Sequence, residues 1–187
     1  MSGWDPTRYR VPLGFVLAAI YLLRARPTPA SLALGLPLAF CGLALRAASA
    51  GHIEKNARLT TSGPYRWTRN PLYLGSLLLA AGFLWVARDW LIAVLVAALL
   101  WGIYLPVIRR EEGFLQSRFG AEFNAYCGAV PRFWPRRRSA AGLPGPAAVF
   151  SWRRYWRHRE YNALLGYLLV TLALLVKMWW RIHGYMP

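Results

Sequence analysis

Long apolar segments that are almost free of charged residues constrain the fold of this chain more than any other feature. There are five of them, at residues 11–23, 30–45, 72–87, 90–108 and 162–180. Because lipid offers no partner to an exposed backbone N–H or C=O group, such segments cross a membrane as α-helices. The first three are shorter than the ~20 residues that span a bilayer core, so flanking Arg and aromatic side chains must extend them. We predict an all-α, polytopic membrane helix bundle with about five transmembrane helices and additional cytoplasmic helices.

The basic residues predict an orientation for this bundle. The chain has 23 Lys+Arg against 7 Asp+Glu, a formal net charge of +16. Threading five helices alternately through a membrane places 18 basic residues on one side and 4 on the other. The positive-inside rule then makes the N-terminus and both long polar loops cytoplasmic and the C-terminus external. The excess charge is expected to attract anionic membrane lipids, and nucleic-acid binding is not expected.

On this plan the chain divides into three parts. Residues 1–50 form an N-terminal transmembrane hairpin. Residues 51–138 form the expected catalytic core, with a cytoplasmic loop, a second hairpin and cytoplasmic helices. Residues 139–187 begin with a Gly/Pro-rich linker at 139–146, followed by an interfacial basic helix and a transmembrane helix. That last helix would either cover the bundle or mediate dimerisation.

Metal chemistry is not expected. Cys41 lies in the second apolar segment, Cys127 lies in a basic loop, and the three His are spread over distant segments. A zinc or thiolate site needs ligands at closer and more regular spacing.

The first polar loop, residues 59–75, leads into the third apolar segment. Its sequence LTTSGPYRWTRNPLYLG is rich in turn-forming residues, and Pro71 is suited to the first turn of a helix. Asn70 would then be the N-cap, and the helix start would present free backbone N–H groups to a carboxylate or phosphate.

The second polar loop follows the fourth apolar segment. Arg109, Arg110, Glu111 and Glu112 come first, and apolar residues then recur at helical spacing up to Tyr126. We expect one or two cytoplasmic helices here, packed under the bundle. The two carboxylates would lie at the membrane surface, where charges are partly desolvated.

Together the two loops carry a pair of motifs. The first is Thr-Ser-Gly-Pro-Tyr-x-x-x-Arg-Asn-Pro-x-Tyr-x-Gly, ending at Gly75, and the second runs from Glu111-Glu112-x-x-Leu to Val130-Pro131. Over about residues 50–135 the chain resembles the isoprenylcysteine carboxyl methyltransferase and phospholipid methyltransferase superfamily of integral membrane enzymes. The carboxyl methyltransferase branch usually has Arg-His-Pro where this chain has Arg69-Asn70-Pro71, and the Asn form is similar to the phospholipid-methylating branch.

The resemblance implies S-adenosylmethionine bound on the cytoplasmic side, between the two loops, and a lipophilic acceptor that arrives from the bilayer. The acceptor would be an isoprenylcysteine-like carboxylate or a phospholipid amine. The expected cofactor-binding residues are Gly63, Pro64, Tyr65, Arg69, Asn70, Pro71, Tyr73, Glu111 and Glu112. The expected catalytic residues are Arg109, Arg110 and Glu111, with an arginine as the nearest cation to an anionic acceptor.

Other interpretations remain open from the sequence alone. Gly63-Pro64 can be a simple turn, and Glu111 and Glu112 can neutralise Arg109 and Arg110. The stretch from Tyr126 to Pro131 is also similar to NADPH-dependent membrane reductases of the sterol reductase type, although a phosphate-rich cofactor favours cations over a pair of carboxylates. A third alternative is a non-enzymatic membrane scaffold.

Overall fold

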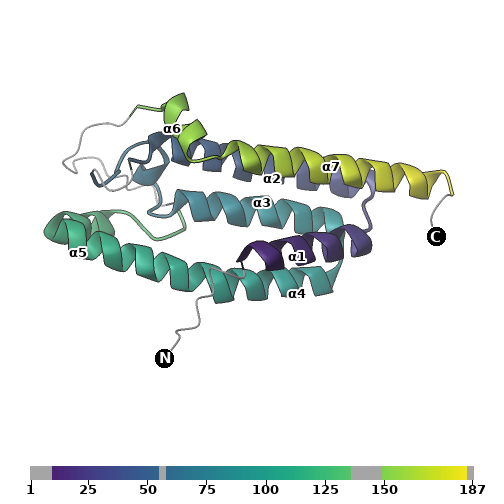
Figure 1. Ribbon diagram of the computed structural model, residues 1–187, viewed down its shortest axis with the longest axis horizontal. Helices are drawn as coiled ribbons and strands as arrows, with labels where there is room; N and C mark the ends of the chain where they lie inside the picture. The colour runs from purple at the N-terminus through teal and green to yellow at the C-terminus, as the bar shows by residue number, and fades with distance from the viewer. Residues whose placement is uncertain (1–9, 55–57, 136–148, 185–187) are drawn as a thin grey trace.

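The computed structural model describes residues 10–54, 58–135 and 149–184, and every regular element in these ranges is a helix. The elements are α1 (Arg10–Arg24), α2 (Pro29–His52), η1 (Gly63–Arg66, a 3-10 helix), α3 (Pro71–Ala87), α4 (Trp90–Leu99), η2 (Leu100–Tyr104, a π-helix), α5 (Leu105–Ala129), α6 (Trp152–Arg157) and α7 (Tyr161–Ile182). The predicted all-α class is confirmed. The long helices run side by side along the long axis of the molecule (Figure 1).

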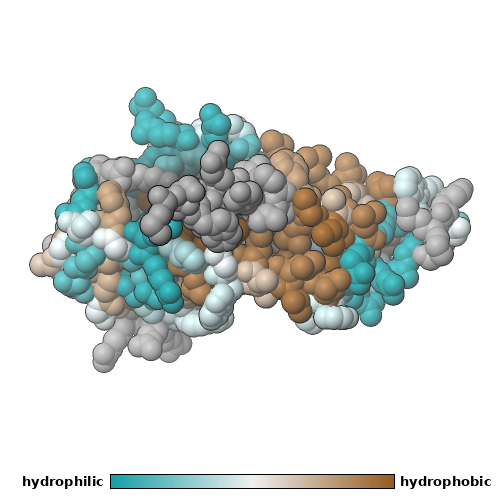
Figure 2. Space-filling model, turned by 60° about the horizontal axis from the view of Figure 1, so that its bottom comes forward, coloured by the Kyte–Doolittle hydropathy of each residue, from teal (hydrophilic) through white to brown (hydrophobic). Residues whose placement is uncertain are grey.

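Three helical stretches are long and apolar enough to cross a membrane. They are Pro29–His52, the continuous stretch Trp90–Ala129, and Tyr161–Ile182. Gly14–Arg24 and Pro71–Ala87 are apolar but shorter. On the face seen in Figure 2, a band of hydrophobic side chains lies between hydrophilic residues at both ends of the molecule. These features are those of an integral membrane protein.

Helices α2 and α3 pack closely through glycines spaced seven residues apart on both helices. A Cβ added to Gly42 would lie 2.5 Å from the carbonyl oxygen of Gly75, and one added to Gly82 would lie 2.5 Å from that of Gly35. No real side chain fits at such distances, so the two backbones are in direct contact. Glycines at these positions therefore allow close packing of the two helices.

The fourth apolar segment continues directly into the second polar loop. Pro106 has no N–H group for the carbonyl four residues earlier, and the turn before it widens into the π-helix η2. Helix α5 then runs on to Ala129 with a kink at Gly120, whose φ is 49°. The expected cytoplasmic helices are therefore two parts of α5. Pro37 lies inside α2, which continues on both sides of it.

The segment before α7 folds back onto the end of α2. The carbonyl oxygen of Gly51 accepts hydrogen bonds from the backbone N–H of Ser151 (3.0 Å) and from Arg154 Nε (2.8 Å), and Arg154 pairs with Glu54 at 2.5 Å. The expected basic helix is present as α6, although Arg154 points towards protein atoms. The predicted linker at 139–146 lies outside the described residues.

Candidate functional site

The loop between α2 and α3 turns inward at a glycine. Gly63 has a φ of 57°, and a Cβ there would lie 2.5 Å from the imidazole ring of His52 at the end of α2. Only glycine combines this conformation with this space. Pro64 follows in the first turn of η1, and Tyr65 of this turn is buried. The Gly63-Pro64 pair therefore shapes the loop, and the residue it brings into the interior is Tyr65.

The residues just before α3 are joined to the segment that follows α5. The backbone N–H of Arg69 donates to the carbonyl oxygen of Pro131 (2.9 Å), and Thr68 Oγ1 donates to that of Arg132 (3.0 Å). Asn70 occupies the N-cap position, as predicted, but its side chain does not cap the helix. Its Nδ2 donates to the Arg132 carbonyl (3.3 Å) and to Glu112 Oε1 (3.4 Å). The two polar loops thus meet in space.

Glu112 lies at the centre of this junction. Its carboxylate accepts a hydrogen bond from Arg132 Nε (3.1 Å) and lies 3.6 Å from Arg69 Nη1. The hydrogen bond to Glu112 raises the pKa of Arg132. Within the described residues Glu112 therefore pairs with cations from two other segments, whereas Arg109 and Arg110 are exposed on α5.

Glu111 faces a different neighbour. Its Oε2 accepts a hydrogen bond from the Tyr73 hydroxyl (3.0 Å), which ties α5 to the first turn of α3. The Tyr73 ring packs edge-on against Tyr104 of η2, with centroids 5.5 Å apart. The two adjacent carboxylates consequently face separate parts of the junction.

A cavity of about 70 Å³ lies between these elements. Seven of the predicted site residues line it: Tyr65, Arg69, Asn70, Pro71, Tyr73, Glu111 and Glu112. Gly63, Pro64, Arg109 and Arg110 are not among its lining residues. The remaining walls are apolar or aromatic, from Ile53, Leu72, Leu115, Phe123 and Tyr126.

Two buried polar atoms beside this cavity have no hydrogen-bond partner among the described residues. They are the hydroxyl oxygen of Tyr65 and Nε of Arg69. Burial raises the pKa of Tyr65, so its hydroxyl stays protonated and is available as a donor. Because a buried polar group without a partner costs free energy, the pair indicates that a polar ligand belongs here.

A second cavity, of about 150 Å³, adjoins the first and shares Leu72, Tyr73 and Glu111 with it. It opens between α3, η2 and the start of α7. Arg46 and Glu160 line it, and Arg46 Nη2 lies 2.9 Å from both carboxylate oxygens of Glu160. Arg46 also donates to the hydroxyl of Ser76.

Sequence reasoning missed Arg46, Glu160 and Arg132 as site residues. Arg46 sits directly after the second apolar segment, where an arginine is expected as a membrane-interface residue. Its partner lies 114 positions away, and no local pattern connects the two.

The family assignment agrees with this geometry. Residues 32–122, from α2 to the middle of α5, match the phospholipid methyltransferase family. The matched residues make up just under half of the chain, and over them it is similar to that family. Both Arg132 and Glu160 lie beyond the matched residues.

Named relatives of the chain fall into two groups. The chain is 35% identical over 142 residues to the cobalt-zinc-cadmium resistance protein CzcN of Cupriavidus metallidurans, covering 68% of this chain and 62% of that one. It is 33% identical over 83 residues to the nickel-cobalt-cadmium resistance protein NccN of Alcaligenes xylosoxydans xylosoxydans, covering 44% and 38%. It is 31% identical over 78 residues to the protein-S-isoprenylcysteine O-methyltransferase of Schizosaccharomyces pombe, covering 42% and 33%.

The chain thus spans less than two thirds of the length of each of these relatives. No solved structure matches it.

Proposed function

We propose that this protein is an integral membrane methyltransferase that uses S-adenosylmethionine and methylates a lipophilic or lipid acceptor. The observation that carries the proposal is the junction of the two polar loops around one cavity, with two carboxylates and two buried donors that lack a partner within residues 10–54, 58–135 and 149–184. The family similarity supports a methyl donor over NADPH, because the match is to methyltransferases.

The residues of the first cavity fit the polar groups of S-adenosylmethionine. Its amino group and ribose hydroxyls need acceptors, which Glu111 and Glu112 supply, and its carboxylate needs a donor, which Arg69 Nε supplies. Tyr65 would donate its free hydroxyl. When bound, the cofactor supplies an electrophilic methyl group on a sulfonium centre, and the protein has to align the acceptor and exclude water.

The cavities are small for this task, which leads to a further expectation. At about 70 and 150 Å³ each lies below the 300–1,000 Å³ usual for a ligand site. The contact between Tyr73 and Glu111 stands between them. We expect cofactor binding to open that contact and join the two cavities into one.

The second cavity is the proposed place of the acceptor. It lies beside α3 and η2, so a lipophilic molecule would reach it from the bilayer. Arg46 would attract an acceptor carboxylate, and Glu111 or Glu160 would attract an acceptor amine and remove its proton. Arg46 therefore replaces Arg109 and Arg110 in the role of the cation nearest to the acceptor.

The proposal includes five transmembrane helices, with α1 and α3 crossing alongside the three longer stretches. In this arrangement the N-terminus and the site are cytoplasmic, and the C-terminus is external. The names of two relatives concern metal resistance and that of another concerns isoprenylcysteine methylation. We therefore assign the acceptor only as a lipophilic molecule.

Calorimetry of the detergent-solubilised chain tests the cofactor. We expect S-adenosylhomocysteine to bind and NADPH not to bind. Binding of NADPH alone would favour the reductase alternative, and no binding of either ligand would favour a scaffold. Incubation with labelled S-adenosylmethionine and a host lipid extract would then show which lipid gains the methyl group.

A further inference from the structure

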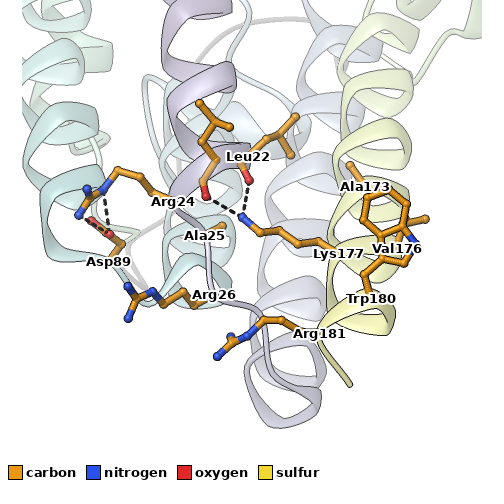
Figure 3. Close-up of a pocket in the computed structure, with 11 residues that line it drawn as sticks. Leu22, Arg24, Ala25, Arg26, Asp89, Ala173, Val176, Lys177, Trp180 and Arg181 are labelled. Atoms are coloured by element: carbon orange, nitrogen blue, oxygen red, sulfur yellow. Dashed lines mark hydrogen bonds and ion pairs between the residues drawn. The ribbon is translucent and has the colours of Figure 1, made fainter. Parts of the chain in front are cut away.

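A larger cavity lies at the opposite end of the bundle, where α1, α7 and the start of α4 meet. Its volume is about 820 Å³. Apolar side chains of Leu22, Ala173 and Val176 form its walls, and the ring of Trp180 lies beside Ala173 and Val176 (Figure 3). None of its lining residues belongs to the site described above, so it requires a separate explanation.

Cations converge on this cavity. Five Lys and Arg residues lie at this end of the described chain, and four of them line the cavity: Arg24, Arg26, Lys177 and Arg181. The fifth, Arg88, lies outside it. Asp89 is the one carboxylate in the lining. The local net charge is therefore +3, on a side of the bundle that has few basic residues in total.

The carboxylate of Asp89 already has hydrogen-bond and ion-pair partners. Asp89 lies 2.8 Å from Arg24 Nη2, and its Oδ1 accepts the N–H groups of Leu91 (2.9 Å) and Ile92 (3.1 Å) at the start of α4. Within the described residues neither Arg26 nor Arg181 pairs with a carboxylate. Both guanidinium groups lie towards the outer end of the cavity in Figure 3.

Lys177 of α7 lies deeper in the cavity, where α7 packs against α1. Its Nζ donates to the carbonyl oxygens of Leu22 (2.6 Å) and Leu23 (2.7 Å) at the end of α1. This contact fixes one positive charge deeper in the cavity than the two arginines, at the level of the apolar walls (Figure 3). The cavity thus has cations at its mouth and hydrocarbon further in.

We propose that this cavity binds an anionic phospholipid. Its phosphate would lie between Arg26 and Arg181, and one acyl chain would follow the apolar groove between α1 and α7. The net positive charge of the cavity complements a phosphate. The depth of the apolar walls favours a lipid over a free ion as the occupant. The cavity also lies at a membrane interface in the proposed arrangement, where lipids are present at high local concentration. The proposal is independent of the methyltransferase assignment.

A photoreactive phosphatidylglycerol tests this site in the detergent-solubilised full chain. Labelling of peptides that contain residues 22–26 and 173–181 is measured against lipid concentration. We expect saturable labelling by phosphatidylglycerol and little by an equivalent phosphatidylcholine. The double variant R26Q/R181Q should shift half-saturation about 30-fold upward, since each surface cation strengthens attraction to an anionic lipid about fivefold.

The matched control is Arg88→Gln, at the same end of the bundle but outside the cavity, which should stay within twofold of the wild type. Equal labelling by the two lipids in the wild type would overturn the proposal, whether or not the double variant folds. An unchanged half-saturation in a folded double variant would overturn it too. Competition by inorganic phosphate as effective as that by unlabelled phosphatidylglycerol would assign the site to a free anion instead.

Discussion

Replacing Glu112 by Gln removes one negative charge from the proposed cofactor site and keeps the side chain almost the same size. The Glu112 side chain is 13% exposed, and the neighbouring Arg69 side chain is 16% exposed. Water therefore compensates little for the charged hydrogen bond that the substitution removes. A hydrogen bond to a charged group contributes about 1.5–3 kcal/mol, so S-adenosylhomocysteine should bind about 10- to 150-fold more weakly. The same substitution leaves Arg69 without its carboxylate, which should lower the free energy of unfolding by about 1–3 kcal/mol.

Calorimetry at a temperature where the variant is folded separates the two effects. Glu122→Gln is the matched control, because Glu122 lies on the same helix, is exposed, and does not line either cavity. The control should bind S-adenosylhomocysteine as the wild type does. If folded Glu112→Gln protein binds it within twofold of the wild type, Glu112 has only a structural role and the proposed contact is refuted.

Three further substitutions have clear expected outcomes. Gly82→Ala should push α2 and α3 apart and lower the free energy of unfolding by about 1–3 kcal/mol in a denaturant titration, whereas Gly166→Ala, with no atom near its added Cβ, should not. Gly63→Ala should cost at least about 1–2 kcal/mol for its left-handed backbone, measured in the same titration, and Gly113→Ala in the open part of α5 should not. Arg46→Gln should slow label transfer to a carboxylate acceptor and leave the affinity for S-adenosylhomocysteine unchanged; a loss of that affinity would place Arg46 in the cofactor site.

Much of the fold follows from local features of the sequence. Uncharged apolar segments have one stable form in lipid, and this makes the helical class and the approximate helix positions predictable. The start of α3 at Pro71 and the turn at Gly63 follow from the restricted backbones of proline and glycine. The meeting of the two polar loops was expected only from the resemblance, and it is present in the contacts of residues 68–70 with Pro131 and Arg132.

The specific partners of charged residues did not follow from the sequence. Glu112 pairs with Arg132, twenty positions later, although Arg109 and Arg110 are much closer along the chain. Arg110 and Glu112 are two positions apart on the helix and point in different directions, and Arg109, which is three positions away, is exposed. Proximity in sequence therefore does not select the partner. Arg46 and Glu160 meet because the start of α7 lies beside the end of α2. Lys177 reaches α1 because α7 also packs against α1. Such pairs depend on how distant helices pack.

Photochemical cross-linking of labelled S-adenosylmethionine to the purified full chain, followed by peptide mapping, tests the central claim most directly. We predict label on two separate peptides, one within residues 58–73 and one within residues 108–132, with both signals removed by excess S-adenosylhomocysteine. Label on only one of these segments, label elsewhere in the chain, or label that excess S-adenosylhomocysteine does not displace would contradict a cofactor site formed jointly by the two polar loops.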